Sequence, residues 1–274
     1  MKIIVLSDNN TLREDLETEH GLCIYIENDG YKCLLDTGAS DVFVRNAEKL
    51  NVDLKAVDYV FISHGHADHI GGLPAFLDIN TKAKIVMSAN VLQQKYFSKR
   101  NGLHSISIAF DWKSLGNRLV LVDEEAKFEN DIQVLRVDTL KHAMPLGNSN
   151  LYKEIDNEML PDDFDHELVV RIGSEEILVF TGCAHKGLLN ILEALHIKPN
   201  ERIRCVVGGF HLLDAKGETV YETETALLEL AQTLKRKYPF TDFITGHCTG
   251  KNAFTTMKKY LEFRLIHFFT GYTY

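Results

Sequence analysis

The sequence contains few cysteines, no long apolar run and a deficit of positive charge. Its five cysteines are an odd number and include no Cys-x-x-Cys pair, which favours reduced thiols over a disulfide framework. The apolar run that opens the chain meets Asp8 after a few residues, too early for a signal-peptide core or a membrane span. These absences predict a cytoplasmic protein without a membrane-spanning segment.

Basic residues are outnumbered by acidic ones: 30 Lys and Arg stand against 39 Asp and Glu, which gives a formal net charge of −9. Because contacts to nucleic-acid phosphates need clustered Lys and Arg, we expect no nucleic-acid partner. The charge suits a protein that binds divalent cations and a small-molecule substrate. Nothing in the sequence indicates an oligomeric state.

The pattern of apolar residues predicts a single α/β domain over residues 1–274, with a variable, loop-rich insertion around 98–165. The irregular stretch 141–165 is expected to be a long surface loop near the entrance of the site. Strands are predicted at 2–6, 22–27, 31–35, 59–62, 84–87, 106–109, 119–122, 132–137, 168–172, 177–180, 204–207 and 243–245, and helices at 41–50, 68–77, 91–97, 188–195, 222–235 and 252–261.

Three imidazoles and a carboxylate fall within six positions directly after the predicted strand at 59–62. They are His64, His66, Asp68 and His69. All are ligand types for Zn²⁺ or a similar first-row metal. In an extended loop, residues two apart share a side, so His64 and His66 can bind one ion together. Asp68 and His69 face differently and can bind a second ion, and we expect Asp68 to be the catalytic carboxylate as well.

Three later histidines follow predicted strands and lie beside glycines, where α/β folds gather ligand-binding groups. These are His185, His211 and His247, and we predict that they complete the metal site. Cys183 is a further candidate as a thiolate ligand, with a buried, unreactive cysteine as the alternative. Asp36, at the end of the strand at 31–35, is predicted to orient a ligating imidazole, with a simple turn residue as the alternative.

A candidate binding site for a substrate phosphate follows His247. Thr249, Gly250 and Lys251 open the last predicted helix, whose free N–H groups and positive end favour an anion. Capping of this helix by the Thr249 side chain is the structural alternative. His142 and His166 lie in or next to the predicted entrance loop and are candidates for substrate contact.

The residues quoted above carry a resemblance to a known family. FISHGHADHIGG, with LLDTGAS upstream, resembles the metallo-β-lactamase superfamily, whose signature is HxHxDH. TGCAHKG, GGFHL and GHCTG extend the likeness over nearly the whole chain and are similar to the dihydropteroate-synthase-like branch, which includes the dihydropterin ribofuranosylaminobenzene 5'-phosphate synthases. The resemblance implies a four-layer αββα sandwich with two divalent metals at the edge where the sheets meet.

The resemblance also implies a ligand set and a mechanism. His64, His66 and one later His would hold the first metal, while Asp68, His69 and His247 would hold the second. A bridging hydroxide would be available as the nucleophile. Zinc is the expected metal, and Mn, Fe or Ni would also suit imidazole and carboxylate ligands.

Three functions remain open from the sequence. Hydrolysis of a small, phosphate-bearing substrate by a two-metal-activated water is the main prediction. The resembled branch suggests instead a pterin-type transferase that releases pyrophosphate. Members of that branch carry a Gly-Glu-apolar-Pro-Arg segment, and the nearest stretch here, 141–146, lacks both the acid and the Arg. The third function is a metal-dependent ligand-binding protein without turnover.

Overall fold

Two β-sheets stacked face to face form the centre of the molecule. The computed structural model describes residues 1–28, 30–215 and 221–274. The first sheet has the order β1 (Lys2–Ser7), β2 (Cys23–Asn28), β3 (Tyr31–Leu35), β4 (Tyr59–Phe61), β5 (Lys84–Ser88) and β8 (Leu119–Val122). The second has the order β17 (Leu265–His267), β16 (Asp242–Thr245), β15 (Arg202–Val207), β14 (Glu176–Phe180), β13 (Leu168–Ile172), β10 (Ile132–Arg136) and β9 (Glu125–Phe128).

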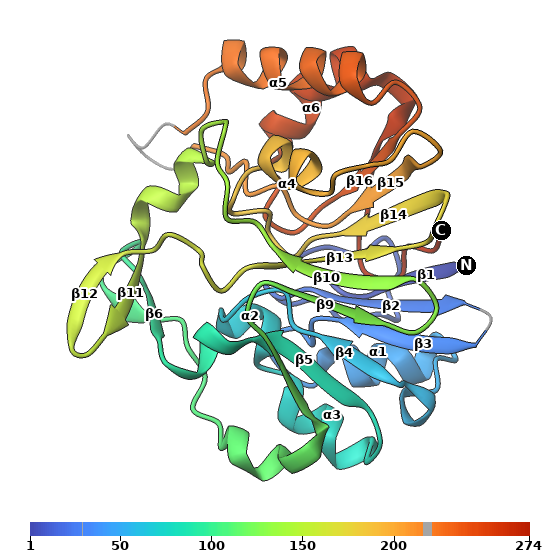
Figure 1. Ribbon diagram of the computed structural model, residues 1–274, viewed down its shortest axis with the longest axis vertical. Helices are drawn as coiled ribbons and strands as arrows, with labels where there is room; N and C mark the ends of the chain where they lie inside the picture. The colour runs from blue at the N-terminus through green and yellow to red at the C-terminus, as the bar shows by residue number, and fades with distance from the viewer. Residues whose placement is uncertain (29, 216–220) are drawn as a thin grey trace.

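Helices cover the outer face of each sheet (Figure 1). α1 (Val42–Lys49) and α3 (Leu73–Ile79) lie against the first sheet, and α4 (Leu188–Ala194), α5 (Glu224–Lys237) and α6 (Lys251–Leu261) lie against the second. A one-turn helix, α2 (Ala67–Ile70), lies at the edge of the sandwich, and 3₁₀ turns occupy Leu54–Ala56, Ala89–Leu92, Trp112–Arg118, Leu146–Asn150 and Glu262–Arg264. The predicted four-layer αββα sandwich is thereby confirmed.

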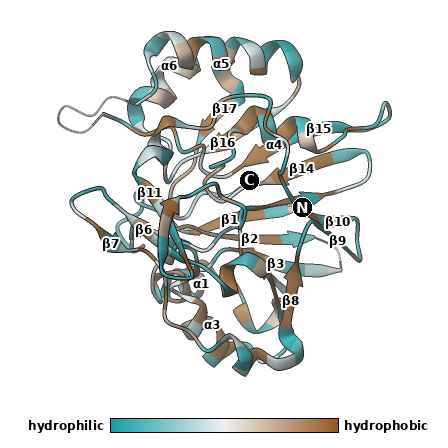
Figure 2. Ribbon diagram, turned by 60° about the vertical axis from the view of Figure 1, so that its left-hand side comes forward, coloured by the Kyte–Doolittle hydropathy of each residue, from teal (hydrophilic) through white to brown (hydrophobic). Residues whose placement is uncertain are grey.

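Side-chain alternation along the strands explains why both faces of each sheet are apolar. In β1, Ile3 and Val5 belong to the core between the sheets, whereas Ile4 and Leu6 belong to the core under α1 and α3. Strands buried on both faces need apolar residues at nearly every position. Most strands of the two sheets are accordingly coloured hydrophobic in Figure 2, whereas α5 and α6 carry hydrophilic segments.

Parallel pairing within each sheet determines where the site lies. β3, β4 and β5 are parallel neighbours in the first sheet, as are β14, β15 and β16 in the second. The loops at the carboxyl ends of parallel strands meet at one edge of a sheet, which is where such folds place their binding groups.

A small third sheet projects from one end of the sandwich and corrects three predictions (Figure 1). Its order is β12 (Glu158–Pro161), β11 (Leu151–Ile155), β6 (Lys95–Ser98) and β7 (His104–Ser105). We call these four strands the arm. The predicted helix at 91–97 is wrong, because Lys95–Ser98 pairs with Leu151–Glu154, and cross-strand pairing overrides a local helical pattern. The predicted loop at 141–165 contains two strands, and residues 106–109 form none.

Among the described residues, no helix is both long enough and apolar enough to cross a membrane.

Candidate metal centre

The loops that follow four strands bring the predicted ligands to the edge where the two sheets meet. The segment after β4 supplies His64, His66, Asp68 and His69. The loop after β14 supplies Cys183 and His185, the loop after β15 supplies His211, and the loop after β16 supplies His247. All eight residues are buried except Asp68, whose side chain is 22% exposed and faces a cavity.

A first cluster contains His64, His66 and His185. The centroid of the His64 ring lies 4.5 Å from that of His66 and 4.9 Å from that of His185, and the other two centroids are 5.1 Å apart. The Nε2 atom of each ring is buried and has no hydrogen-bond partner among the described residues. Buried polar atoms normally have hydrogen-bond partners, so three such nitrogens on neighbouring imidazole rings fit a bound cation.

A second cluster contains Asp68, His69 and His247. Oδ2 of Asp68 lies 3.6 Å from Nε2 of His69 and 3.4 Å from Nε2 of His247. Within the described chain, Nε2 of His247 is also buried without a hydrogen-bond partner. A carboxylate and two imidazoles are again a suitable ligand set for a divalent first-row metal.

Cys183 stands between the two clusters. Its Sγ atom lies 3.3 Å from Nε2 of His69. It belongs to three groups of ligand atoms that lie within 4.8 Å of one another: one with His64 and His185, one with His69 and His247, and one with His211 and Cys248. A single thiolate at this position could contact both ions.

Four of the five imidazoles in the two clusters are oriented by a hydrogen bond at their other ring nitrogen. Because Nδ1 donates to an oxygen, the lone pair is left on Nε2, the atom that faces the cluster. The acceptors are Ser63 for His64 (2.8 Å), Asp36 for His69 (2.6 Å), Asn148 for His185 (2.9 Å) and Asn9 for His247 (3.3 Å).

Asp36, predicted to orient an imidazole, connects the two clusters. Its Oδ2 accepts from Nδ1 of His69 and, at 2.7 Å, from Oγ of Ser63, and its Oδ1 accepts from the Ser63 backbone N–H at 2.7 Å. Since Ser63 Oγ donates to Asp36, it accepts from Nδ1 of His64. One carboxylate therefore sets the orientation of one histidine from each cluster.

Burial sets the charge of the first cluster. It lowers the pKa of His64, His66 and His185, and neighbouring imidazoles lower the pKa of His64 and His185 further. These rings are consequently neutral at neutral pH, the form that binds metal.

The second cluster differs in charge. Burial would lower the pKa of His247, but the Asp68 carboxylate, whose Oδ2 lies 3.4 Å from Nε2, outweighs burial and raises this pKa to about 9. Burial would raise the pKa of Asp68, yet the adjacent His69 and His247 hold it well below its ordinary value. Without a metal, the second cluster therefore holds a carboxylate paired with an imidazolium.

His211 lies beside the first cluster but contacts a different partner. Its ring centroid is 4.1 Å from that of His185, and its Nε2 is 3.1 Å from Nη2 of Arg100. A guanidinium only donates, so Nε2 of His211 must be the acceptor and the ring proton lies on Nδ1. Cys183 and Cys248 also place their sulfur atoms within 4.8 Å of a His211 ring nitrogen.

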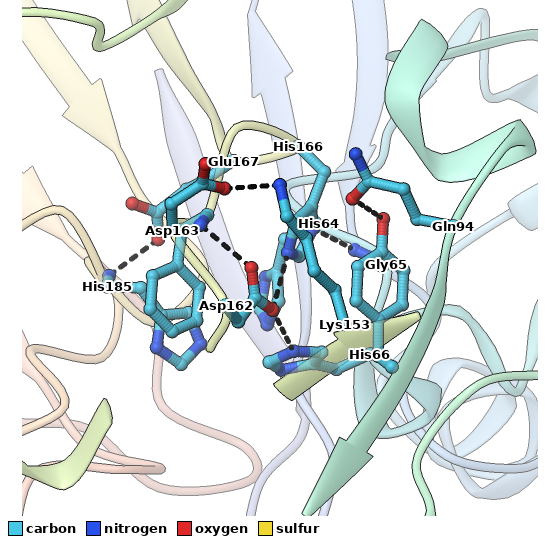
Figure 3. Close-up of polar contacts among 12 residues, drawn as sticks. His64, Gly65, His66, Gln94, Lys153, Asp162, Asp163, His166, Glu167 and His185 are labelled. Carbon is cyan, nitrogen blue, oxygen red and sulfur yellow. Dashed lines mark hydrogen bonds and ion pairs between the residues drawn. The ribbon is translucent and has the colours of Figure 1, made fainter. Parts of the chain in front are cut away.

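Two residues that the sequence did not single out as a pair contact His66 from the arm side (Figure 3). Oδ2 of Asp162 lies 3.7 Å from Nε2 of His66 and 3.1 Å from Nε2 of His166. The Gly65 N–H donates to Nδ1 of His166 at 3.0 Å. Both ring nitrogens of His166 therefore have hydrogen-bond partners within the protein. This residue supports the segment after β4 instead of facing substrate.

The predicted phosphate site at the start of α6 has a different occupant. The backbone N–H groups of Lys251 and Asn252 donate to the Asp214 carboxylate at 2.8 and 2.9 Å. Thr249 Oγ1 accepts from the Phe210 N–H at 3.0 Å. A phosphate could reach these donors only by displacing Asp214. His142, the other candidate for substrate contact, pairs with Glu193 and does not line the cavity over the metal centre.

That cavity has a volume of about 740 Å³. It is lined by His66, Asp68, Cys183, His185, His211 and His247, by Ser98 and Leu151 of the arm, and by Arg100 in the turn between β6 and β7. The volume falls within the range of small-molecule sites. The ligand clusters are thus accessible to a substrate of modest size.

The geometry agrees with comparisons to known proteins. Residues 16–197 match the family model described as the metallo-beta-lactamase superfamily. The chain is 28% identical over 251 residues to the 7,8-dihydropterin-6-methyl-4-(beta-D-ribofuranosyl)-aminobenzene-5'-phosphate synthase of Methanocaldococcus jannaschii, which covers 86% of this chain and 83% of the relative. An uncharacterised protein of the same organism is 25% identical over 267 residues, 96% of this chain and 95% of that protein.

Among solved structures, Tm1679, described as a metal-dependent hydrolase of the beta-lactamase superfamily, superimposes with a TM-score of 0.81 at 28% identity. The alignment covers 100% of this chain and 98% of that one. Because the family model spans more than half of the sequence and the fold agrees throughout, this chain belongs to the metallo-β-lactamase superfamily.

Proposed function

We propose that the protein is a metal-dependent hydrolase that uses a pair of divalent ions, with zinc as the expected metal, to cleave a small, phosphate-bearing substrate. One observation carries the proposal: the Nε2 atoms of His64, His66, His185 and His247 are buried and have no hydrogen-bond partner among the described residues. A buried polar atom without a partner destabilises a fold, and a metal at each cluster would remove that cost.

In this proposal most of the side chains bind the ions, and one of them, Asp68, also accepts a proton. His64, His66 and His185 would hold one ion, and Asp68, His69 and His247 the other, with Cys183 shared between them. Two divalent ions supply an acidified water and polarise a carbonyl or phosphoryl oxygen. Asp68 is ionised and faces the cavity, so its carboxylate can accept a proton from an attacking water. Asp36 and Ser63 keep the imidazoles aligned during the reaction.

A pterin-type transferase that releases pyrophosphate is the second candidate. It is supported by the 28% identity to the archaeal synthase, which extends over 86% of this chain. In such a reaction the same clusters would bind the leaving group while an amine attacks. A metal-dependent binding protein without turnover is the third candidate, because ligand clusters alone do not require a reaction.

Metal analysis combined with a substrate screen tests the proposal. The purified protein is expected to hold about two divalent ions and to hydrolyse a generic phosphodiester, ester or lactone. A chelator should abolish turnover, and added zinc should restore it. His64→Ala should lose about one ion together with turnover, whereas the matched variant His142→Ala, outside the cavity, should keep both ions and turnover.

The alternatives give different results. Consumption of a pterin diphosphate together with an arylamine, without hydrolysis of any ester, would replace the hydrolase by the transferase. Bound metal and bound pterin without any product would leave only the binding protein.

A further inference from the structure

A guanidinium that has no carboxylate partner among the described residues lines the cavity at the metal centre. Arg100 occupies the turn between β6 and β7, and its side chain lines the cavity. Nη2 donates to the Gly147 carbonyl at 3.0 Å and to Nε2 of His211 at 3.1 Å. Its Nε atom is buried and has no hydrogen-bond partner in the described part of the chain. Of the described residues that line the cavity, Arg100 is the one Lys or Arg.

No carboxylate of the described residues neutralises the charge of Arg100. Across the ranges that the structure describes, no carboxylate oxygen lies within 4.0 Å of its guanidinium nitrogens. Several other arginines of this acidic chain do pair with carboxylates, as Arg45 does with Glu17 at 2.7 Å and Arg171 does with Glu201 at 2.8 Å. A partly buried cation that retains unused N–H donors is poised to receive an anion, since guanidinium groups form strong, geometrically specific bonds to carboxylates and phosphates.

The arm holds this guanidinium in a fixed place. The Arg100 backbone N–H donates to Oγ of Ser98 at 3.1 Å, and Ser98 pairs with Leu151 across the arm. At Gly147, a Cβ atom would lie 3.0 to 3.1 Å from the ring of His211, so glycine leaves room for the Arg100 and His211 side chains to meet. Donors already held in place lose little freedom on binding.

The alternative anion site is satisfied internally. Asp214 accepts from both Lys251 and Asn252 at the start of α6, so that helix end has its carboxylate already. Asp68, the other acidic residue on the cavity wall, faces His69 and His247 and does not pair with Arg100. The cavity therefore offers a negative group at the metal centre and an unused positive group on the arm.

We propose that Arg100 binds an anionic group of the substrate, a phosphate or a carboxylate, and so positions the scissile bond over the two clusters. The proposal deepens the hydrolase function and rests on it for the nature of the reaction. The binding step itself can be measured without turnover. The proposed anion contact is thus at Arg100, beside the arm, and not at the predicted helix end at Thr249–Lys251.

Calorimetry with three matched probes tests the proposal on the metal-loaded protein: glycerol 3-phosphate, glycerate and glycerol. The wild-type protein is expected to bind one or both anions and not the neutral alcohol, and the stronger anion identifies the substrate group. Arg100→Gln should weaken that binding about ten-fold or more, because a charged contact is removed. Arg100→Lys should recover part of the affinity, since lysine keeps the positive charge but lacks the paired N–H donors of the planar guanidinium.

Two controls separate this result from damage to the site. Lys99→Gln removes the neighbouring charge, which lies over the Tyr152 ring, and should leave affinity within about two-fold of wild type. Metal content, measured by elemental analysis, should be equal in all four proteins.

Specific outcomes would overturn the proposal. They are wild-type affinity in Arg100→Gln, an equal loss in Lys99→Gln, a loss that follows the metal content, or no binding of either anion by the wild-type protein. If the substrate screen showed no hydrolysis but anion binding still depended on Arg100, the proposed hydrolase function would be wrong and the proposed role of Arg100 would be supported. If the protein hydrolysed a substrate and Arg100→Gln bound the anion as tightly as wild type, only the proposed role of Arg100 would be wrong.

Discussion

The two sheets deliver their side chains to the metal centre in different ways. The first sheet supplies His64, His66, Asp68 and His69 from one short segment after β4, and this segment contributes to both clusters. The second sheet supplies its residues from the ends of three parallel strands, β14, β15 and β16. A compact motif can be recognised in the sequence, whereas the dispersed set depends on the order of the strands.

This difference between the sheets also predicts which changes disturb one cluster and which disturb both. A change in the backbone of the segment after β4 should disturb both clusters, because neighbouring residues of this segment would bind different ions. On the second sheet, His185 lies in the first cluster and His247 in the second. Cys183 is the exception there, because its sulfur lies close to both clusters.

Replacing Cys183 has the largest expected effect. In Cys183→Ala we expect bound metal to fall by half or more, because both proposed ions lose the shared ligand. His185→Ala, by comparison, should lose about one ion. Elemental analysis of gel-filtered protein measures the difference.

Cys205→Ala is the matched control, since Cys205 is buried in the core between the sheets and away from the clusters. It should keep its metal. If Cys183→Ala retained as much metal as Cys205→Ala, Cys183 would be an inert buried cysteine and the second sheet would have no shared ligand.

A smaller effect is expected from Asp36→Asn. An amide has one acceptor oxygen and cannot replace a carboxylate that accepts from the Ser63 backbone, the Ser63 hydroxyl and His69. We expect metal affinity to fall about 10- to 100-fold, the range for loss of a group that orients a ligand. Competition with a coloured chelator measures this affinity.

The matched control is Asp58→Asn. Asp58 accepts from the Lys32 N–H at 3.0 Å and pairs with Lys82, so it stabilises the first sheet without touching a ligand. Equal metal affinity in both variants would mean that Asp36 supports the strand end and not the imidazoles.

Local patterns were enough to predict the β4 segment, Asp36 and most of the strands. The HxHxDH spacing is contained in one short segment, a loop that leads into α2, and Asp36 directly follows β3, a strand that pairs with β4. The sandwich follows from apolar runs buried on both faces. In each case the deciding contacts lie within a strand or between strands that neighbour each other in the sheet.

The arm and its contacts could not be predicted in this way. Lys95–Ser98 becomes a strand only because residues 151–154, far along the chain, pair with it. Asp162 and His166 reach the metal loop only because the arm folds back over it. The same applies to Asp214, which meets the start of α6 through a loop with no sequence pattern that indicates a cap. Such contacts depend on tertiary structure that no local spacing records.

The smallest expected effect is on the number of protons released when metal binds, which should differ between the two clusters because their charges differ. In the metal-free protein the raised pKa of His247, about 9, keeps this ring protonated at pH 7. An ion that binds Nε2 of His247 must therefore release that proton. His64, His66 and His185, whose pKa values are lowered, release none. Affinity at the second cluster should rise about ten-fold per pH unit for this proton and level off above pH 9.

Calorimetric titration with zinc in two buffers of different ionisation enthalpy counts the protons released at pH 7. Cys183, whose pKa is raised by burial, contributes its thiol proton at either cluster and so does not distinguish them. His185→Ala, which retains the second cluster, should release about one proton more per ion than His247→Ala, which retains the first. Equal proton release in the two variants would show that the Asp68–His247 pair does not hold the second cluster in its charged form, and the two sheets would then differ only in how their ligands are spaced along the chain.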